Sequence, residues 1–308
     1  MKTVLITTSS FAENSPELLE IMAANGLRIV NNPYRRQLSE SEFDQLLKEH
    51  KPIGLLAGTE KISRAHLEQA SEHLCVISRV GVGWDNVDRK AAEDMGILIY
   101  RTPGVLTEAV AELTIGLILS GLRFIPDQDR MVRQGRWRKK MGGLLLGREV
   151  GIIGFGAIGQ RVGELVKAFG ACVFYYDPCP SNVSWATAVP LHDLLKTADV
   201  ISIHAAGNEV IMGAAEFQSI KKQNVILVNT ARGSLIDEES LYQCLRNGRL
   251  GYACLDVFNH EPYEGPLCRL KNVVLTPHIG SYALEARRLM ERCAVENLLA
   301  GLKKARAL

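Results

Sequence analysis

The chain of 308 residues lacks a charge excess, a long apolar run and closely spaced cysteines. Its 36 basic and 34 acidic side chains leave a formal net charge of +2, which gives no general electrostatic reason to bind nucleic acid or an anionic membrane. The longest apolar stretch, residues 113–122, is about half of what a membrane helix needs, so it predicts a buried helix. The apolar run near the N-terminus is too short for a signal peptide core and predicts a strand.

The seven cysteines are odd in number and show no CxxC spacing, which favours reduced thiols and a cytoplasmic location. No metal site is expected. Hydrophobic residues make up 47% and charged residues 23% of the chain, close to globular averages, which excludes a disordered or fibrous protein. At roughly 100 to 200 residues per domain, the length predicts two domains, each large enough to bury its own core.

What the sequence does contain is a repeated alternation of short β-rich segments and helix-like segments. In the second half, the β-rich segments recur about every 25 residues, and helix-like segments separate the first five of them. This alternation predicts a parallel sheet with right-handed crossovers, and the continuously apolar strands indicate a sheet covered on both faces. The predicted strands are EVGII (149–153), CVFYY (172–176), DVISI (199–203), NVILV (224–228), LGYACL (250–255) and NVVLT (272–276).

The first hundred residues alternate in the same way and predict a second, smaller doubly wound domain. Ser39 and Glu42 have capping-box spacing at the start of a predicted helix. Pro103 and Gly104 mark the linker, and a long helix is expected from about Thr107. The predicted fold class is α/β, with two doubly wound parallel-sheet domains, the second a Rossmann unit. The predicted strands of the first domain are TVLIT (3–7), LRIVN (27–31), PIGLLA (52–57), LCVIS (74–78) and ILIY (97–100).

A GxGxxG turn follows the strand 149–153 directly and opens a helix. Gly154 permits the tight turn, Gly156 lets backbone amides approach a pyrophosphate, and Gly159 allows close helix–strand packing. Asp177 ends the next strand, where an acid binds ribose hydroxyls and repels a 2′-phosphate, so NAD is expected rather than NADP. A flavin or another adenine nucleotide is the alternative. The residues expected to contact the dinucleotide at this turn are Gly154, Gly156, Ala157, Ile158 and Gly159.

Polar residues also follow three later strands, where ligands of open parallel sheets bind. Arg232 comes after 224–228, Glu261 after 250–255 and His278 after 272–276. Reduction of a 2-oxo acid needs a cation for the carboxylate and a proton donor for the carbonyl oxygen. Arg232 suits the first task, and His278, kept protonated by Glu261, suits the second. Each residue alone could be structural, and the hypothesis rests on their joint placement at strand ends.

With these motifs the sequence resembles the D-isomer-specific 2-hydroxyacid dehydrogenases, most closely the D-3-phosphoglycerate dehydrogenase group. The resemblance runs from about Ser78 to Ser281, through SRVGVGWDNVD, TPGVLTEAVAEL, GIIGFGAIGQRV, VNTARGSLID, LDVFNHEP and TPHIGS in that order. It implies a flavodoxin-like substrate-binding domain formed by residues 1–101 and 283–308 and a NAD-binding Rossmann domain formed by residues 102–282. It also implies that Arg232, Glu261 and His278 are the catalytic residues.

The resemblance further implies which residues contact ligands. The predicted substrate contacts are Arg79, Val80, Gly81 and Arg232. The predicted nicotinamide and ribose contacts are Thr230, Asp256, His278 and Gly280, and Ala231 is a further predicted cofactor contact. The predicted adenosine-side contacts are Asp177, His204 and Ala206. A homodimer is implied, with the helix after Thr107 near its interface, and the basic segment 136–140 is a second candidate for substrate contact from the neighbouring subunit.

Two departures from the family bear on substrate and cofactor. The adenine-side loop at residues 204–208 has no proline where relatives usually carry one. Glu60 and Lys61 stand where relatives that bind phosphoglycerate often offer an arginine, which argues against recognition of a phosphate group.

The leading hypothesis is a NAD-dependent 3-phosphoglycerate dehydrogenase-like enzyme. The alternatives are a reductase of glyoxylate, hydroxypyruvate or another 2-oxo acid, and, in a different class, an NADH-sensing corepressor-like binding protein.

Overall fold

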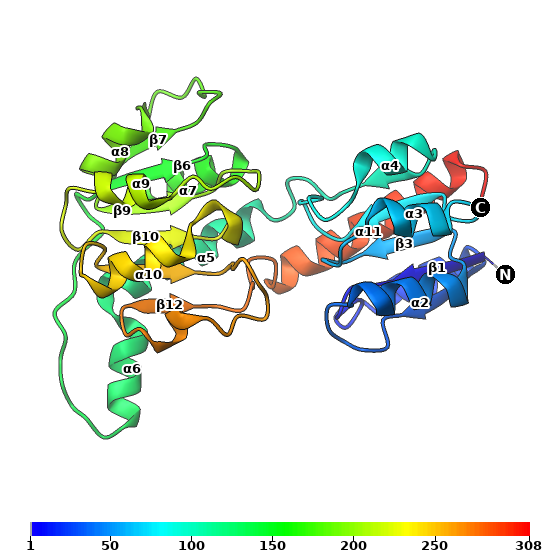
Figure 1. The fold of residues 1–308 in the computed structure, drawn as a ribbon, viewed down its shortest axis with the longest axis horizontal. Helices are drawn as coiled ribbons and strands as arrows, with labels where there is room; N and C mark the ends of the chain where they lie inside the picture. Colours follow the sequence, from blue (N-terminus) through cyan, green and yellow to red (C-terminus); the bar gives the residue numbers. More distant parts are fainter. Residues whose placement is uncertain (1) are drawn as a thin grey trace. The chain divides into compact units, whose positions relative to one another are not determined.

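The computed structural model describes residues 2–308, which form two compact units. The first unit comprises the chain up to Leu106 together with Ser281–Leu308, and the second comprises Thr107–Gly280. Both are α/β units with entirely parallel sheets, as the strand spacing predicted (Figure 1). These divisions lie within a few residues of the boundaries expected at residues 101 and 283.

The sheet of the first unit has five strands in the order β2-β1-β3-β4-β5. Helices α2, α3 and α4 pack on one face, and α1 and α11 pack on the other. The C-terminal helix therefore completes the core of the N-terminal segment. The strands are β1 (Lys2–Ile6), β2 (Leu27–Asn31), β3 (Gly54–Ala57), β4 (Val76–Arg79) and β5 (Leu98–Tyr100); the helices are α1 (Glu17–Ala24), α2 (Glu40–His50), α3 (Arg64–Ala70), α4 (Arg89–Asp94) and α11 (Leu284–Lys304).

The sheet of the second unit has seven strands in the order β12-β11-β10-β9-β6-β7-β8. The strand order changes direction between β6 and β9, which is the point where open α/β sheets bind ligands. The strands are β6 (Glu149–Ile153), β7 (Cys172–Tyr176), β8 (Thr187–Ala188), β9 (Val200–Ile203), β10 (Ile226–Asn229), β11 (Tyr252–Leu255) and β12 (Val273–Leu275).

Helices cover both faces of this second sheet. Helices α5 and α7 share one core with it, and α8, α9 and α10 share the other. The apolar stretch at residues 113–122 lies in α5, which buries nine of its residues, so the prediction of a buried helix is confirmed. The helices are α5 (Thr107–Arg123), α6 (Ile125–Arg133), α7 (Ala157–Ala168), α8 (Leu191–Thr197), α9 (Ala214–Ser219) and α10 (Glu238–Arg246), with short 3-10 turns at Gly233–Leu235 and Pro266–Arg269.

Every strand predicted from the sequence is present, whereas the short strand β8 and helices α4, α6 and α11 (Leu284–Lys304) were not predicted. Strand β8 has two exposed residues, and α6 has no buried residue, so neither leaves an apolar pattern in the sequence. Across residues 2–308, no single helix is long and apolar enough to span a membrane; α5 and α6 meet that test only as a pair, which bends by 63°.

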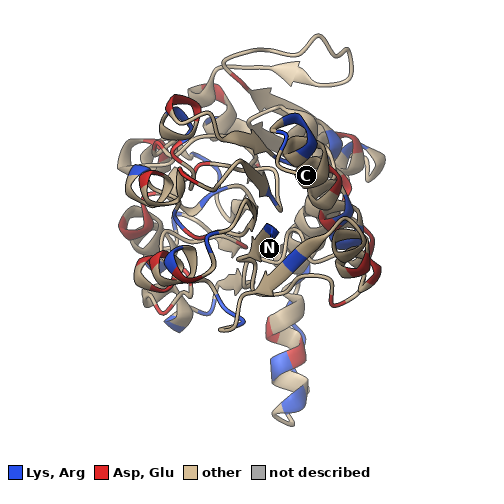
Figure 2. Cartoon of the chain, turned by 90° about the vertical axis from the view of Figure 1, so that its right-hand side faces the viewer, with Lys and Arg blue, Asp and Glu red and all other residues tan. Residues whose placement is uncertain are grey.

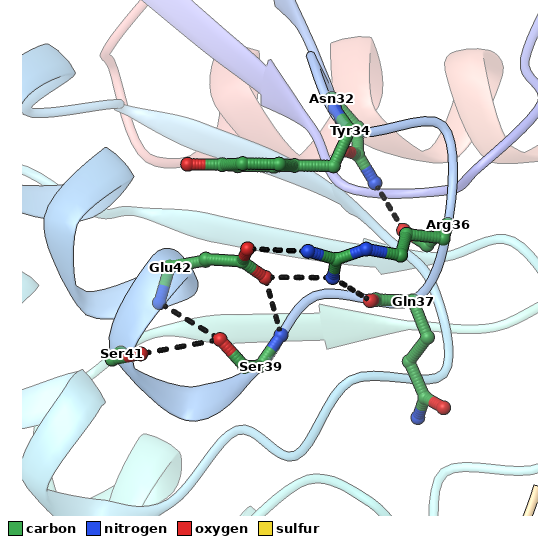
Figure 3. A network of polar contacts seen from close by, with 7 residues as sticks. All are labelled: Asn32, Tyr34, Arg36, Gln37, Ser39, Ser41 and Glu42. Carbon is green, nitrogen blue, oxygen red and sulfur yellow. Dashed lines mark hydrogen bonds and ion pairs between the residues drawn. The ribbon is translucent and has the colours of Figure 1, made fainter.

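The predicted capping box at the start of α2 is confirmed (Figure 3). The Ser39 side chain accepts a hydrogen bond from the Glu42 backbone N–H at 3.3 Å, and the Glu42 carboxylate accepts one from the Ser39 N–H at 2.9 Å. Two guanidinium nitrogens of Arg36 donate hydrogen bonds to the same carboxylate, at 2.6 and 2.9 Å. The hydrogen bond from Arg36 is the main cause that lowers the pKa of Glu42 to about 2.

Candidate active site

The glycine turn between β6 and α7 has the geometry that a pyrophosphate needs. Gly154 has a φ of +89°, and a Cβ there would overlap the backbone of Ala205. A Cβ on Gly159 would overlap the carbonyl oxygen of Gly154, so the helix packs directly on the turn. Gly156 begins α7 without a side-chain cap, and nothing lies within 4 Å of its potential Cβ. The first amides of α7 therefore have room beside them for a phosphate group.

Asp177 follows β7 and is hydrogen-bonded to this turn. One carboxylate oxygen accepts a hydrogen bond from the Phe155 N–H at 2.6 Å, and the other accepts one from the Cys179 N–H at 2.8 Å. These bonds hold the acid beside the glycine turn. The side chain is only half-buried, so it can also accept bonds from ribose hydroxyls.

The loop after β9 supplies the predicted adenosine-side residues. Its backbone at Ala205 packs against Gly154, and Ala206 is exposed. Burial lowers the pKa of His204 to about 3, so this imidazole is neutral near pH 7. Its Nε2 lies 2.8 Å from the Ser202 hydroxyl. His204 therefore brings no positive charge to this part of the site.

The loops after β10 and β11 lie in contact. A Cβ on Gly233 would overlap the Phe258 backbone, so only glycine permits this approach. Asn229 shapes the first loop: its side chain accepts a hydrogen bond from the Ala231 N–H at 3.0 Å and donates one to the Arg232 carbonyl at 2.8 Å. Thr230 is buried, with its hydroxyl 3.0 Å from that of Thr114 in α5.

Asp256 joins the loop after β11 to the loop that carries His278. Its carboxylate is 1% exposed and accepts hydrogen bonds from the Thr276 hydroxyl at 2.6 Å, the Ile279 N–H at 2.8 Å and the Gly280 N–H at 2.9 Å. The residue between these anchors, His278, has a φ of +53°, which is uncommon outside glycine. The three bonds therefore hold the histidine loop in a conformation that the chain alone disfavours.

His278 and Glu261 form the central pair of the site. The His278 Nδ1 lies 2.8 Å from Glu261 Oε2, and the other oxygen of Glu261 accepts a hydrogen bond from the Phe258 N–H at 3.1 Å. The hydrogen bond to Glu261 is the largest cause of the raised pKa of His278. Burial raises the pKa of Glu261, but the hydrogen bond and charge of His278 outweigh it, and the pKa is lowered overall. A protonated imidazole beside a carboxylate is thus favoured.

Arg232 lies close enough to this pair to act on both groups. Its positive charge helps to lower the pKa of Glu261 and opposes protonation of His278. Its Nη1 donates a hydrogen bond to the Ala231 carbonyl at 2.7 Å, which orients the guanidinium from its own loop. The second unit therefore brings Arg232, Glu261 and His278 together from three strand ends.

The predicted substrate contacts Arg79, Val80 and Gly81 belong to the first unit, at the carboxyl end of β4. The Arg79 guanidinium folds back and donates to the Val80 carbonyl at 2.5 Å, and it would be 2.8 Å from a Cβ on Gly81. Sequence reasoning gave no structural role to Asn229, Gly233 or Thr276. Asn229 ends β10, Gly233 lies four residues beyond it, and Thr276 directly follows β12. These positions near strand ends were a signal, but the partners of each side chain could not be predicted from the sequence.

Across residues 2–308, no group of three or more His, Cys, Asp or Glu side chains is arranged to hold a metal ion. The residues present fit a dinucleotide instead, since the glycine turn is open at Gly156 and an acid stands beside it at Asp177. A dinucleotide bound there would be held by the α7 amides and by the Asp177 carboxylate.

Comparisons with known proteins agree with this geometry. Residues 115–280 match the family model described as D-isomer specific 2-hydroxyacid dehydrogenase, NAD binding domain. A D-3-phosphoglycerate dehydrogenase from Methanocaldococcus jannaschii is 39% identical over 272 residues, covering 85% of this chain and 51% of that protein. A hydroxypyruvate reductase from Thermotoga maritima is 40% identical over 258 residues, covering 80% of this chain and 84% of that protein. The crystal structure of the TT0316 protein from Thermus thermophilus has a TM-score of 0.89 at 35% identity and covers 98% of this chain and 97% of that one.

The fold and the matches define a NAD-dependent dehydrogenase. The chain belongs to the D-isomer specific 2-hydroxyacid dehydrogenase family. It spans about half the length of the Methanocaldococcus jannaschii relative. The predictions of the family, the fold class, the enzyme class and NAD as the cofactor are confirmed. The roles of the individual site residues stay predictions.

Proposed function

We propose that this protein transfers a hydride between nicotinamide C4 and C2 of a short D-2-hydroxy acid or the corresponding 2-oxo acid. The observation that supports this proposal most strongly is the 2.8 Å contact between His278 and Glu261 beside Arg232. In the family to which the chain belongs, this reaction needs a carboxylate anchor and a proton donor, and these three side chains can supply both.

Each of the three side chains has a distinct part in this proposal. Arg232 pairs with the substrate carboxylate, because its planar fork matches the two oxygens and its charge is permanent. His278 gives a proton to the carbonyl oxygen in reduction and accepts it in oxidation. Glu261 orients the imidazole through Nδ1 and keeps it protonated. Bound NADH supplies the hydride.

Two finer substrate assignments are supported by relatives of similar identity. One is the 3-phosphoglycerate dehydrogenase type, which the sequence motifs favoured, and the other is a hydroxypyruvate or glyoxylate reductase. The test is NADH oxidation with glyoxylate, hydroxypyruvate and the 3-phosphate ester of hydroxypyruvate, each at several concentrations. Saturable oxidation with at least one acid is expected. Binding of NADH without turnover of any 2-oxo acid, together with NADH-dependent capture of a protein partner, would instead favour the sensor.

We also infer that the protein is a homodimer. The segment after α6 exposes large apolar side chains, with Trp137 84% and Met141 92% exposed. Helix α6 carries acidic and basic residues around it, as Figure 2 shows for the helix that projects downward. A second copy of the chain would cover this surface and pair with its charges.

Light scattering should give twice the monomer mass for the wild type, and Trp137→Glu should lower the measured mass. A monomeric wild-type protein would contradict the inference. A cytoplasmic location remains a prediction.

A further inference from the structure

Gln160 lies in the first turns of α7, and its half-buried side chain is bonded to two separate loops of the second unit. Its amide nitrogen Nε2 donates hydrogen bonds to the Phe155 carbonyl at 2.9 Å and to the Ser181 hydroxyl at 2.9 Å. A primary amide has two N–H groups, so both bonds can form at the same time. Phe155 belongs to the glycine turn, and Ser181 belongs to the loop that follows β7. Gln160 therefore connects the turn to that loop.

The loop after β7, residues 177–181, begins with the predicted ribose contact Asp177 and ends with Ser181. The three residues between them are exposed, so burial of apolar surface contributes little to holding this loop. The Asp177 carboxylate accepts the hydrogen bond from the Phe155 N–H at 2.6 Å, which fixes the start of the loop. The position of the loop therefore depends on polar bonds at its two ends.

Two side chains fix the other end of the loop, at Ser181. One is Gln160, and the other is Tyr175, whose hydroxyl donates a hydrogen bond to the Ser181 carbonyl at 2.7 Å. Tyr175 is 2% exposed, and its ring stacks on the Phe155 ring with the two centroids 3.8 Å apart. Both side chains that hold Ser181 thus also contact Phe155. The glycine turn and the loop after β7 are joined in one network of contacts.

The position of Asp177 bears on which dinucleotide the site accepts. A carboxylate at this place accepts hydrogen bonds from the ribose hydroxyls of NADH and repels the 2′-phosphate of NADPH. Both effects are largest when the carboxylate is held in place before the ligand arrives. A carboxylate on a loosened loop can turn away from a 2′-phosphate, and ordering it around a ribose costs binding free energy. Restraint of the loop therefore increases the difference between the two affinities.

We propose that Gln160 is a positioning residue for cofactor selection, which holds the loop carrying Asp177 against the glycine turn and so increases the preference for NADH over NADPH. Gln160 acts through Ser181 and Asp177 rather than by contact with the dinucleotide. The inference rests on the part of the proposed function in which NADH supplies the hydride. It does not depend on which 2-oxo acid is reduced.

The test compares the Kd values of NADH and NADPH for the wild type and for Gln160→Met, measured by titration without substrate. Methionine keeps the length of the side chain and a high helix propensity, but it has no N–H donor. The wild type should bind NADH about tenfold more tightly than NADPH, or more, because the acid repels the extra phosphate. In Gln160→Met this preference should fall about fivefold, the scale of one lost hydrogen bond. The Kd of NADH should rise, whereas that of NADPH should change little, because the lost order and the relieved repulsion offset each other.

The matched control is Gln243→Met in α10, an exposed position whose amide donates to Glu239 of the same helix at 2.7 Å. Its two Kd values should equal those of the wild type. Ser181→Ala removes the hydroxyl that Gln160 bonds and leaves the Ser181 backbone carbonyl in place. It should lower the preference for NADH in the same direction as Gln160→Met, but by less, because the bond from Gln160 to Phe155 remains.

A double variant separates this role from a merely structural one. Asp177→Ala should reduce the preference for NADH most, and addition of Gln160→Met to Asp177→Ala should leave the ratio of the two Kd values unchanged, because Gln160 acts through that acid. A merely structural role of Gln160 would instead raise both Kd values by the same factor and leave the preference of the single variant at the wild-type value.

Three results would overturn the inference. They are a wild type that binds NADH and NADPH equally, a Gln160→Met variant in which both Kd values move by the same factor or neither moves, and a further loss of preference when Gln160→Met is added to Asp177→Ala. If Gln160→Met does not fold, Ser181→Ala decides, and an unchanged preference in that variant would refute the role of Gln160. Failure of the proposed function is distinct, because the wild type would then reduce no 2-oxo acid, while the Kd values would still decide this inference.

Discussion

At the scale of single residues, the His278–Glu261 contact sets the protonation state on which the proposed chemistry depends. The hydrogen bond that His278 donates to the Glu261 carboxylate raises the pKa of His278, so the imidazole holds its proton to higher pH than an ordinary histidine. Reduction consumes that proton and should therefore remain fast until the pH passes the raised pKa. Oxidation requires the neutral ring and should gain as the pH rises through the same value.

Glu261→Gln should shift this balance. The amide keeps a hydrogen bond possible but removes the negative charge, so the pKa of His278 falls towards its ordinary value. The pH at which kcat/KM for reduction declines should move to lower pH, and reduction at pH 8 should fall more than reduction at pH 6. The measurement is the pH profile of kcat/KM with a 2-oxo acid. A profile identical to that of the wild type would show that Glu261 does not tune the histidine.

The sequence located these residues because carboxyl ends of parallel strands share one edge of a sheet. It could not give their mutual geometry. The 2.8 Å contact depends on Gly233 packing against Phe258. Such contacts join residues far apart in the chain, and no local pattern encodes them.

At the scale of elements, the histidine loop is held in place by a strand end. Residues 276–280 have almost no secondary structure of their own, and His278 has a positive φ. A non-glycine residue in such a conformation costs of order 1–3 kcal/mol, which surrounding contacts must offset. The three bonds to Asp256 provide that offset and fix the direction in which the imidazole points.

Asp256→Ala should therefore weaken both stability and turnover. The buried N–H of Gly280 and the half-buried N–H of Ile279 would lose their acceptor, at about 1–3 kcal/mol each. The free energy of unfolding should fall by about 2–5 kcal/mol in urea, and kcat should fall with it. Asp193→Ala, at an exposed position of α8, should change stability by less than about 0.5 kcal/mol. An Asp256→Ala variant as stable and active as the wild type would refute the anchoring role.

At the scale of the whole molecule, the chain leaves its first unit, forms the second and returns. Helix α11 packs on β3, β4 and β5, and the Ser78 hydroxyl donates to the Ala294 carbonyl at 2.8 Å. Strand and helix periodicity predicted two domains, but not this return. The return of the chain to the first unit was predicted only from the resemblance to a family, because the sequence pattern of α11 does not indicate which sheet the helix covers.

Leu298→Ala tests this return. Leu298 is fully buried, and its Cδ1 would be 2.7 Å from a Cβ on Gly54 in β3, so truncation leaves a cavity between helix and sheet. A loss of about 2–5 kcal/mol is expected in the unfolding of the first unit. Leu289→Ala, on the same helix but 50% exposed, should cost much less. Equal effects of the two substitutions would contradict the packing of α11.

The most direct measurement of the central claim is the turnover of His278→Ala with a 2-oxo acid, with NADH affinity measured on the same protein. A positioned proton donor contributes about 10²- to 10⁴-fold to the rate. The expected result is a loss of kcat in that range, with the Kd for NADH within about twofold of the wild type. The control variant His192→Ala should keep the wild-type kcat. Retention of wild-type kcat by His278→Ala would contradict the assignment of the proton donor and, with it, the proposed reaction at this site.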